Sequence, residues 1–347
     1  MTPEQLEVLS NQAVAASGVA YFLAFLAHLG QWAAGRQAVP AAMVSVRETV
    51  PAGAGPAPAG RAGVPARGEG VGELDEPERM IMLRRVGVAL TVFAAAVHLL
   101  AVVSRGLAAD PVRVPWGNMY EFTLTSTFFV TAGYLVLYRR FGLSWLSPVV
   151  TGSVLAILML DVLALYERTA MLQDSLQSPW LVIHVVAAVI ATAAFTIGAM
   201  CSALYLVKAR WERNNAAADR APGGYLARLP ELAVLDRVAY RTIAFGFPVW
   251  TFAALIAGPI WAYAAWGRYW GWDPKEVWAF ITWVVYAAYL HARATSGWKG
   301  TSTAMIALVG LATLLWNFVG INFFFGSGSQ HSYAAPEPTA VVLRLDG

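Results

Sequence analysis

Residues 179–206 read PWLVIHVVAAVIATAAFTIGAMCSALYL, a run that contains no Asp, Glu, Lys or Arg. An α-helix needs about 20 apolar residues to cross the hydrocarbon core of a bilayer. The run therefore predicts a membrane-spanning helix with His184 near its start. The whole chain of 347 residues is 58% hydrophobic and 13% charged, with a mean hydropathy of +0.55. Soluble globular proteins carry about 25% charged residues, so this composition excludes an ordinary soluble protein.

Seven further apolar runs lie on either side of this segment. The eight predicted spans cover residues 16–34, 86–104, 119–138, 145–166, 179–206, 242–262, 277–294 and 302–325. The sequence thus predicts an all-α polytopic membrane protein of about eight transmembrane helices, whose termini share one side of the membrane. The connecting segments 35–85, 139–142, 207–241 and 293–300 hold 18 of the 24 Lys and Arg residues. Because short positive loops stay in the cytoplasm, both termini are expected on the outer side.

Composition also divides the chain into regions. Residues 1–34 are expected to form an extra N-terminal transmembrane helix, and residues 35–78, rich in Ala, Gly and Pro, a disordered cytoplasmic linker. The main transmembrane domain is predicted at 79–335, followed by an outer tail at 336–347. A short helix around residues 226–234 is expected on the inner membrane surface. The net charge of +3 gives no reason to expect nucleic acid, and the single cysteine permits no internal disulfide.

Six tryptophans lie within residues 261–283, WAYAAWGRYWGWDPKEVWAFITW, which is more than an interfacial aromatic belt requires. Their flat rings predict a stacking platform for a large planar apolar ligand at the outer leaflet. The expected platform residues are Trp261, Trp266, Trp270 and Trp272. Arg268 and Lys275 are expected to neutralise acidic substituents of that ligand. Asp273, which precedes Pro274, is interpreted either as the N-cap of the next helix or as a ligand contact.

Four of the five histidines lie within predicted spans, where ionisable residues are costly and usually functional. His184 and His331 are predicted on the outer side, near the tryptophan segment, whereas His291 and His28 lie in the inner half of the membrane. His98 lies nearer the middle. For His28 and His98 the alternative is a buried imidazole bonded to a backbone carbonyl. Glu121 and Asp161 are expected to be solvated at helix ends; the alternative is that either orients a ligand histidine or contacts an acidic group of the ligand through a cation.

Neutral imidazole is a strong ligand for iron, and two imidazoles on opposite faces of a porphyrin give six-coordinate haem. The chain contains no C-x-x-C-H segment, so the haem would be bound without a covalent link, as haem b. The combination of aromatic rings, two outer histidines and nearby cations predicts an external haem site.

Five segments together resemble a known family. WGRYWGWDPKE at 266–276 looks like the WWD signature of haem-handling membrane proteins. PWGNMYEF at 115–122, SPWLVIHV at 178–185, YLHARATSGWKG at 289–300 and GSGSQHSY at 326–333 follow the order of the CcsA (ResC-type) subunit of the System II cytochrome c synthase. The resemblance covers about residues 86–335 and leaves the first span and the linker unexplained.

The resemblance implies one subunit of a holocytochrome c synthase in the plasma membrane. With a CcsB (ResB-type) partner, such a subunit handles haem across the membrane and positions it for thioether attachment to the C-x-x-C-H segment of apocytochrome c on the outer face. His184 and His331 match the two external haem ligands of the family and would be the catalytic residues; His291 matches an intramembrane haem ligand. In the family, CcsB supplies the haem ligand opposite the residue that matches His291. His28 could take the place of that CcsB ligand on the basis of its depth in the membrane alone. Membrane proteins that reduce thiols are further expected partners.

Two other classes of protein stay open. A bis-histidine membrane cytochrome b would pair histidines on neighbouring spans at matched depths. A haem exporter or chaperone would have the same platform without forming a bond. A generic solute transporter is disfavoured because no Gly- or Pro-broken pair of helices is evident.

Overall fold

The computed structural model describes residues 1–34, 78–169, 178–218, 223–295 and 298–324. The helices are α1 Pro3–Ala34, α3 Glu78–Ala108, α4 Met119–Phe141, α5 Ser147–Leu160, α6 Pro179–Ala217, α7 Leu232–Phe252, α8 Gly258–Trp266, α9 Pro274–Ala294, α10 Thr301–Leu315 and α11 Ile321–Phe324. These described residues contain no strand, and a helix lies at each of the eight predicted spans. Six helical segments are long and apolar enough to cross a membrane. The predicted all-α polytopic fold is confirmed.

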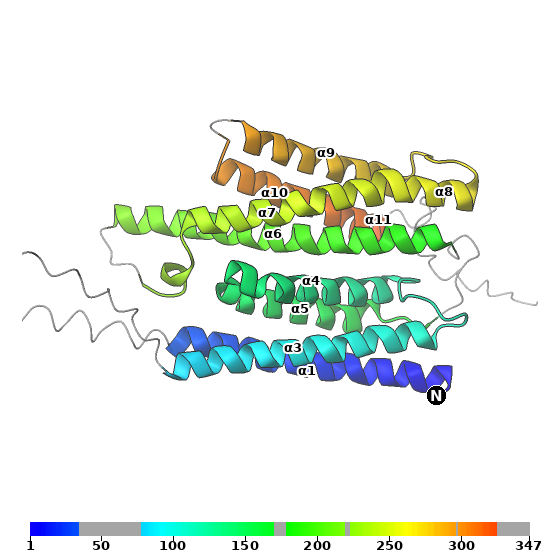
Figure 1. Ribbon diagram of the computed structural model, residues 1–347, viewed down its shortest axis with the longest axis horizontal. Coiled ribbons are helices and arrows are strands. Elements are labelled where there is room, and N and C mark those ends of the chain that lie inside the picture. The colour runs from blue at the N-terminus through cyan, green and yellow to red at the C-terminus, as the bar shows by residue number, and fades with distance from the viewer. Residues whose placement is uncertain (35–77, 170–177, 219–222, 296–297, 325–347) are drawn as a thin grey trace, which may run out of the picture.

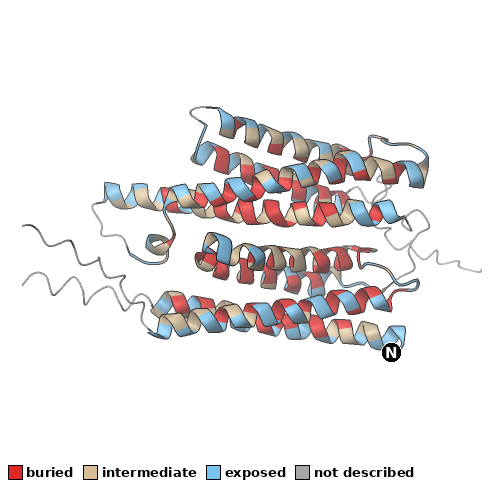
Figure 2. Ribbon diagram, viewed as in Figure 1, coloured by how far each residue is buried: buried red, intermediate tan, exposed pale blue. Residues whose placement is uncertain are grey.

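The helices form four antiparallel pairs that stack in one direction (Figure 1). The pairs are α1 with α3, α4 with α5, α6 with α7 and α9 with α10. Small residues such as Ala94 and Ala101 of α3 are buried, as expected where helices approach closely inside a membrane. Large apolar residues of the first pair, such as Phe22 and Phe93, are exposed instead. Exposed residues recur along both helices of this pair (Figure 2). This pattern suits lipid contact, because lipid tails are as apolar as a protein core.

Three helices contain a π turn, a local widening of the α-helix in which an N–H group bonds to the carbonyl five residues back. The π turns are Asp161–Leu165 after α5, Ala253–Ala257 between α7 and α8, and Trp316–Gly320 between α10 and α11. The turn at 253–257 is followed directly by Gly258 and Pro259, and the turn at 316–320 ends at Gly320. The turns at 253–257 and 316–320 lie toward the end of the bundle that carries residues 267–273, which we name the tryptophan loop (Figure 1).

Two other boundaries differ from expectation. Helix α6 has 39 residues and is about 58 Å long at 1.5 Å per residue, so it projects beyond a hydrocarbon core of about 30 Å.

The prediction of a surface helix around residues 226–234 is wrong. Only a 3-10 turn forms at Leu226–Arg228, because Pro230 interrupts the chain before α7 begins. Lys208 of α6 fixes this connection by donating to the carbonyls of Leu229 (2.7 Å) and Pro230 (2.9 Å). The linker predicted at 35–78 and the tail at 336–347 lie outside the described residues, apart from Glu78.

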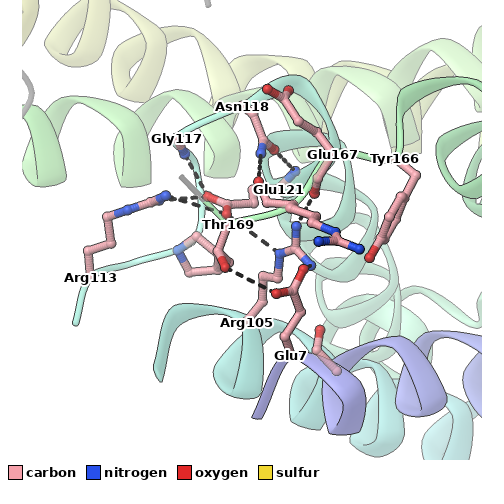
Figure 3. Close-up of polar contacts among 12 residues, drawn as sticks. Glu7, Arg105, Arg113, Gly117, Asn118, Glu121, Tyr166, Glu167 and Thr169 are labelled. Atoms are coloured by element: carbon pink, nitrogen blue, oxygen red, sulfur yellow. Dashed lines mark hydrogen bonds and ion pairs between the residues drawn. The ribbon is translucent and has the colours of Figure 1, made fainter. Parts of the chain in front are cut away.

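A buried charge cluster joins the helices near the N-terminal end of α1 (Figure 3). Arg105 of α3 is fully buried and lies 3.2 Å from Glu7 of α1 and 3.6 Å from Glu121 of α4. Arg105 also donates to the carbonyl of Glu167. Arg113 completes the cluster at 2.6 Å from Glu121. The expectation that Glu121 is solvated is wrong, because the carboxylate is fully buried between two guanidinium groups.

Asp161 is also fully buried, which contradicts its predicted solvation. It occupies the first position of the π turn after α5. Neither of its carboxylate oxygens accepts a hydrogen bond from the residues that the structure describes.

Candidate functional site

The tryptophan loop is fixed at both ends by helix caps. Gly267 ends α8 in the left-handed conformation (φ 71°) and donates its N–H to the Tyr263 carbonyl at 2.9 Å. Asp273 begins α9 as its N-cap and accepts the backbone N–H of Lys275 at 2.9 Å. The capping interpretation of Asp273 is confirmed.

Glu276 ties the loop back onto α9. Its Oε2 atom accepts the backbone N–H groups of Gly271 (2.7 Å) and Asp273 (3.1 Å). Between them, Trp272 has a φ of 58°, which a bulky residue rarely adopts. Sequence reasoning included Glu276 in the WWD signature but gave it no role.

A pocket lies between the tryptophan loop, helices α6, α7, α8 and α9, and the π turns at 253–257 and 316–320. The polar groups in its lining come from His184, Lys275, Glu276 and Asn317, and aromatic rings such as Trp250, Trp261, Trp270 and Phe318 supply much of the rest. A lining of this kind suits a mainly apolar ligand with a few polar contacts.

A hydrogen bond to the backbone determines which nitrogen of His184 carries a proton. His184 Nδ1 lies 2.8 Å from the carbonyl oxygen of Ala253, in the π turn of α7. Because a carbonyl only accepts hydrogen bonds, Nδ1 carries the proton and Nε2 carries the lone pair. Ligand histidines in metalloproteins are oriented in this same way, by a carbonyl or carboxylate on the opposite nitrogen. The Trp261 ring stacks beside the imidazole, with centroids 6.1 Å apart and planes 16° apart.

The structure brings together only part of the predicted platform. Trp261 and Trp270 line the pocket with His184. Trp266 packs edge-on against Trp261 at 4.8 Å, and Trp272 is 75% exposed and nearly perpendicular to Trp270. The four indole rings therefore do not share one plane. Their binding of a ligand stays a prediction.

The two predicted cations differ in their position. Lys275 lines the pocket, and its burial there lowers the pKa of the ammonium to about 8, against the opposing effect of Asp273. Arg268 does not line the pocket. Its guanidinium lies over Gly271, where an added Cβ would be 0.9 Å from an Arg268 nitrogen.

The remaining histidines lie elsewhere. His331 lies outside the described residues, so its predicted pairing with His184 remains a prediction. His291 is exposed in the last turn of α9, about 24 Å along that helix from Lys275. His28 is buried between α1 and α3, at the opposite side of the stack (Figure 1). Its Nε2 atom lies 3.2 Å from the hydroxyl of Thr91. The structure therefore gives His28 no place opposite His291.

His98 is a buried histidine that bonds to a backbone carbonyl, as the alternative to a ligand role predicted. Its two nitrogens contact the Leu124 carbonyl at 3.0 Å and the Tyr21 hydroxyl at 3.2 Å. Among the described residues, no three His, Cys, Asp or Glu side chains gather closely enough to hold a bare metal ion.

Sequence reasoning missed Asn317. This residue lies in the π turn of the last span, is 5% exposed and lines the pocket. Its Oδ1 atom accepts no hydrogen bond from any described residue. A polar amide within an apolar span was the available signal.

Comparison with known proteins identifies the family. A family model described as cytochrome c assembly protein matches residues 116–327. The cytochrome c biogenesis protein CcsA of Guillardia theta is 36% identical over 233 residues, which cover 63% of this chain and 76% of that protein. The CcsA protein of Prochlorococcus marinus is 37% identical over 243 residues, covering 63% and 75%.

A solved structure shares the fold. The cytochrome c heme lyase CcmF superposes on 92% of this chain with a TM-score of 0.59 and 16% sequence identity. This chain spans about half (47%) of that lyase, and the likeness concerns the fold alone. Because the family model covers more than half of its length, the chain belongs to the cytochrome c assembly protein family.

Proposed function

We propose that this chain works in cytochrome c biogenesis as a CcsA-type subunit and that the pocket beside the tryptophan loop binds haem as its substrate. The proposal gives His184 the role of an iron ligand, on the outer side of the plasma membrane. The similarity to CcsA proteins and the family model, whose matched residues 116–327 include this pocket, support cytochrome c maturation as the process.

The observation that carries the proposal is the hydrogen bond from His184 Nδ1 to the Ala253 carbonyl. It places a proton on Nδ1, which is how a protein orients a histidine that binds metal through Nε2. The pocket residues also fit haem in kind, since aromatic side chains suit the porphyrin and Lys275 suits a propionate group. Trp261 stacks beside the His184 imidazole and would help to keep that ring in place when haem binds.

The second axial ligand is proposed to be His331, whose glycine-flanked segment would let the acceptor's own histidine displace it. In the proposed reaction each thiol of the acceptor adds across a haem vinyl group, so that sulfur bonds one carbon and hydrogen the other. This addition changes no net oxidation state, so it needs no oxidant. The thiols must be reduced before they can add, and membrane proteins that reduce thiols are therefore expected partners. The chain's contribution is mainly to hold the haem in position.

His291 supports a partner subunit of the CcsB type. An ionisable side chain that faces lipid is costly, and His291 is exposed near the end of α9. A helix of the partner packed against α9 would cover it and could supply the opposing ligand, a role for which the buried His28 is not placed.

A co-expression experiment tests the proposal. The chain is produced with a CcsB-type partner and a C-x-x-C-H acceptor, and Soret absorption of the purified complex and covalent haem on the acceptor are measured. His184→Ala should lower both signals strongly, whereas Thr192→Ala, two turns farther along α6 and bonded only to its own helix, should lower neither. Normal attachment by His184→Ala would refute the site.

The same experiment separates the alternatives. Bound haem without attachment by the wild-type complex would favour an exporter or chaperone. A bis-histidine cytochrome b is disfavoured because, among the described residues, His28 and His98 bond to other groups instead of facing each other.

A further inference from the structure

Two tryptophans of the tryptophan loop, Trp270 and Trp272, lie in different environments. Trp270 lines the pocket, whereas Trp272 is 75% exposed and is not part of the lining. The chain achieves this separation by placing Trp272 in the left-handed region, with φ at 58°. Non-glycine residues with positive φ are uncommon, and bulky residues among them are outliers that surrounding contacts must hold in place.

Glu276 supplies those contacts. The backbone N–H groups on both sides of Trp272, those of Gly271 and Asp273, donate to the same carboxylate oxygen at 2.7 and 3.1 Å. Glu276 is itself buried in the first turn of α9 and is held there by the capping box with Asp273. The position of the loop is thus set by a side chain that belongs to a rigid helix.

An independent observation marks the adjacent pocket as a ligand site. Asn317, on α10–α11 across from the loop, is buried in the lining with an amide oxygen that no described residue satisfies. Buried polar atoms of this kind are rare because each one costs free energy, and a bound ligand or water is the usual explanation.

We propose that Glu276 is a positioning residue for this pocket. By accepting both amides around Trp272, it holds the loop so that Trp270 forms part of the pocket wall. The inference rests on the proposed function in taking haem as the ligand. The proposed function of Glu276 depends on its acceptor oxygen and not on its negative charge. Glutamine at position 276 should therefore hold the loop, whereas a side chain without a hydrogen-bond acceptor should not.

Hydrogen exchange of the full chain in detergent tests the loop without any ligand. The peptide that covers residues 267–276 is followed by mass spectrometry in the wild type, Glu276→Gln and Glu276→Met. Loss of two hydrogen bonds should speed exchange at Gly271 and Asp273 by about tenfold or more in the Met variant, and the Gln variant should resemble the wild type. Equal protection in all three proteins would overturn the proposal.

Haem titration, read from the Soret band, tests the consequence for the pocket. Glu276→Met should weaken haem binding by about tenfold, and Glu276→Gln by less than about threefold. If Gln weakens binding as much as Met, the charge acts on the ligand and the positioning role is wrong. If the wild type binds no haem, the proposed function fails, while the exchange experiment still decides whether Glu276 holds the loop.

Two double variants separate the backbone of Trp272 from its indole. Both Glu276→Met/Trp272→Gly and Glu276→Met/Trp272→Ala lack the indole, but glycine adopts positive φ without strain. The glycine variant should therefore bind haem more tightly than the alanine variant. Equal affinities would contradict the view that Glu276 stabilises the left-handed residue.

Discussion

Replacing Gly258 by alanine is expected to weaken haem binding by about fivefold while leaving the helix bundle at least as stable. The added Cβ would lie 3.1 Å from His184 Nδ1 and 3.2 Å from the Ala253 carbonyl oxygen, whereas ordinary contacts begin at 3.4 Å. The imidazole must therefore shift by a few tenths of an ångström from the carbonyl that orients it. A hydrogen bond of this kind contributes about 1 kcal/mol, which corresponds to about fivefold in affinity.

The effect on stability should have the opposite sign. Alanine is favoured over glycine in a helix by up to about 1 kcal/mol, which offsets the local crowding. Gly223→Ala serves as the control, because its Cβ would meet nothing within 4 Å. Haem affinity is measured by Soret titration and stability by thermal unfolding in detergent. Unchanged affinity in Gly258→Ala would refute the claim that the Ala253 carbonyl orients His184, and equal losses of affinity in both variants would show a non-specific effect.

Three further predictions concern other parts of the chain. Arg105→Leu should destabilise the protein by about 3 kcal/mol in thermal unfolding, because it removes one of the two guanidinium groups beside the buried Glu121 carboxylate; an unchanged midpoint would contradict the buried ion pair. Haem affinity should fall as pH rises through about 8, where Lys275 loses its proton, and Lys275→Arg should abolish this dependence; a flat profile in the wild type would exclude an ionic contact. Gly87→Ala should lower the thermal midpoint by an amount equivalent to about 1–3 kcal/mol, since the new Cβ would lie 2.6 Å from the His28 ring; retained stability would show that α1 and α3 separate easily.

Hydropathy predicted the helices well because a spanning segment must satisfy every backbone group within itself, so length and apolarity nearly determine its structure. The same reasoning fails for parts that project from the apolar layer. The N-terminal half of α1 is helical from Pro3, not from residue 16, since Ser10 and its neighbours pack on α3 and the Ser10 hydroxyl bonds the Ala101 carbonyl. Residues 226–234 were expected to form a short surface helix, but Pro230 and the bonds from Lys208 decide their conformation.

The site was predictable in its residue types but not in their arrangement. A count of tryptophans indicated an aromatic site, whereas the directions of the rings depend on the left-handed Trp272 and on the Glu276 carboxylate that holds it. The spacing of these residues along the sequence does not reveal the contact between the Glu276 carboxylate and the loop, because that contact forms only in the folded loop. The distance between His28 and His291 is a second example. Equal depth in the membrane suggested a pair, but depth says nothing about which helices are neighbours in the stack.

Each of the three π turns in the described residues lies beside a polar group of this apolar bundle. A carbonyl of a regular α-helix can also accept a side chain of another helix, as the Ala101 carbonyl accepts the Ser10 hydroxyl. At the π turn the backbone pairing shifts by one residue, and the Ala253 carbonyl accepts the Gly258 N–H together with the His184 imidazole. The other two turns carry the buried Asp161 and Asn317. Polar groups deep in the membrane are costly, and in this protein three of them lie at or against positions where the helical register changes. A sequence prediction that assumes 3.6 residues per turn throughout each helix cannot locate these polar groups. Because π turns are frequent at functional sites, they indicate the position of the pocket better than the sequence pattern does.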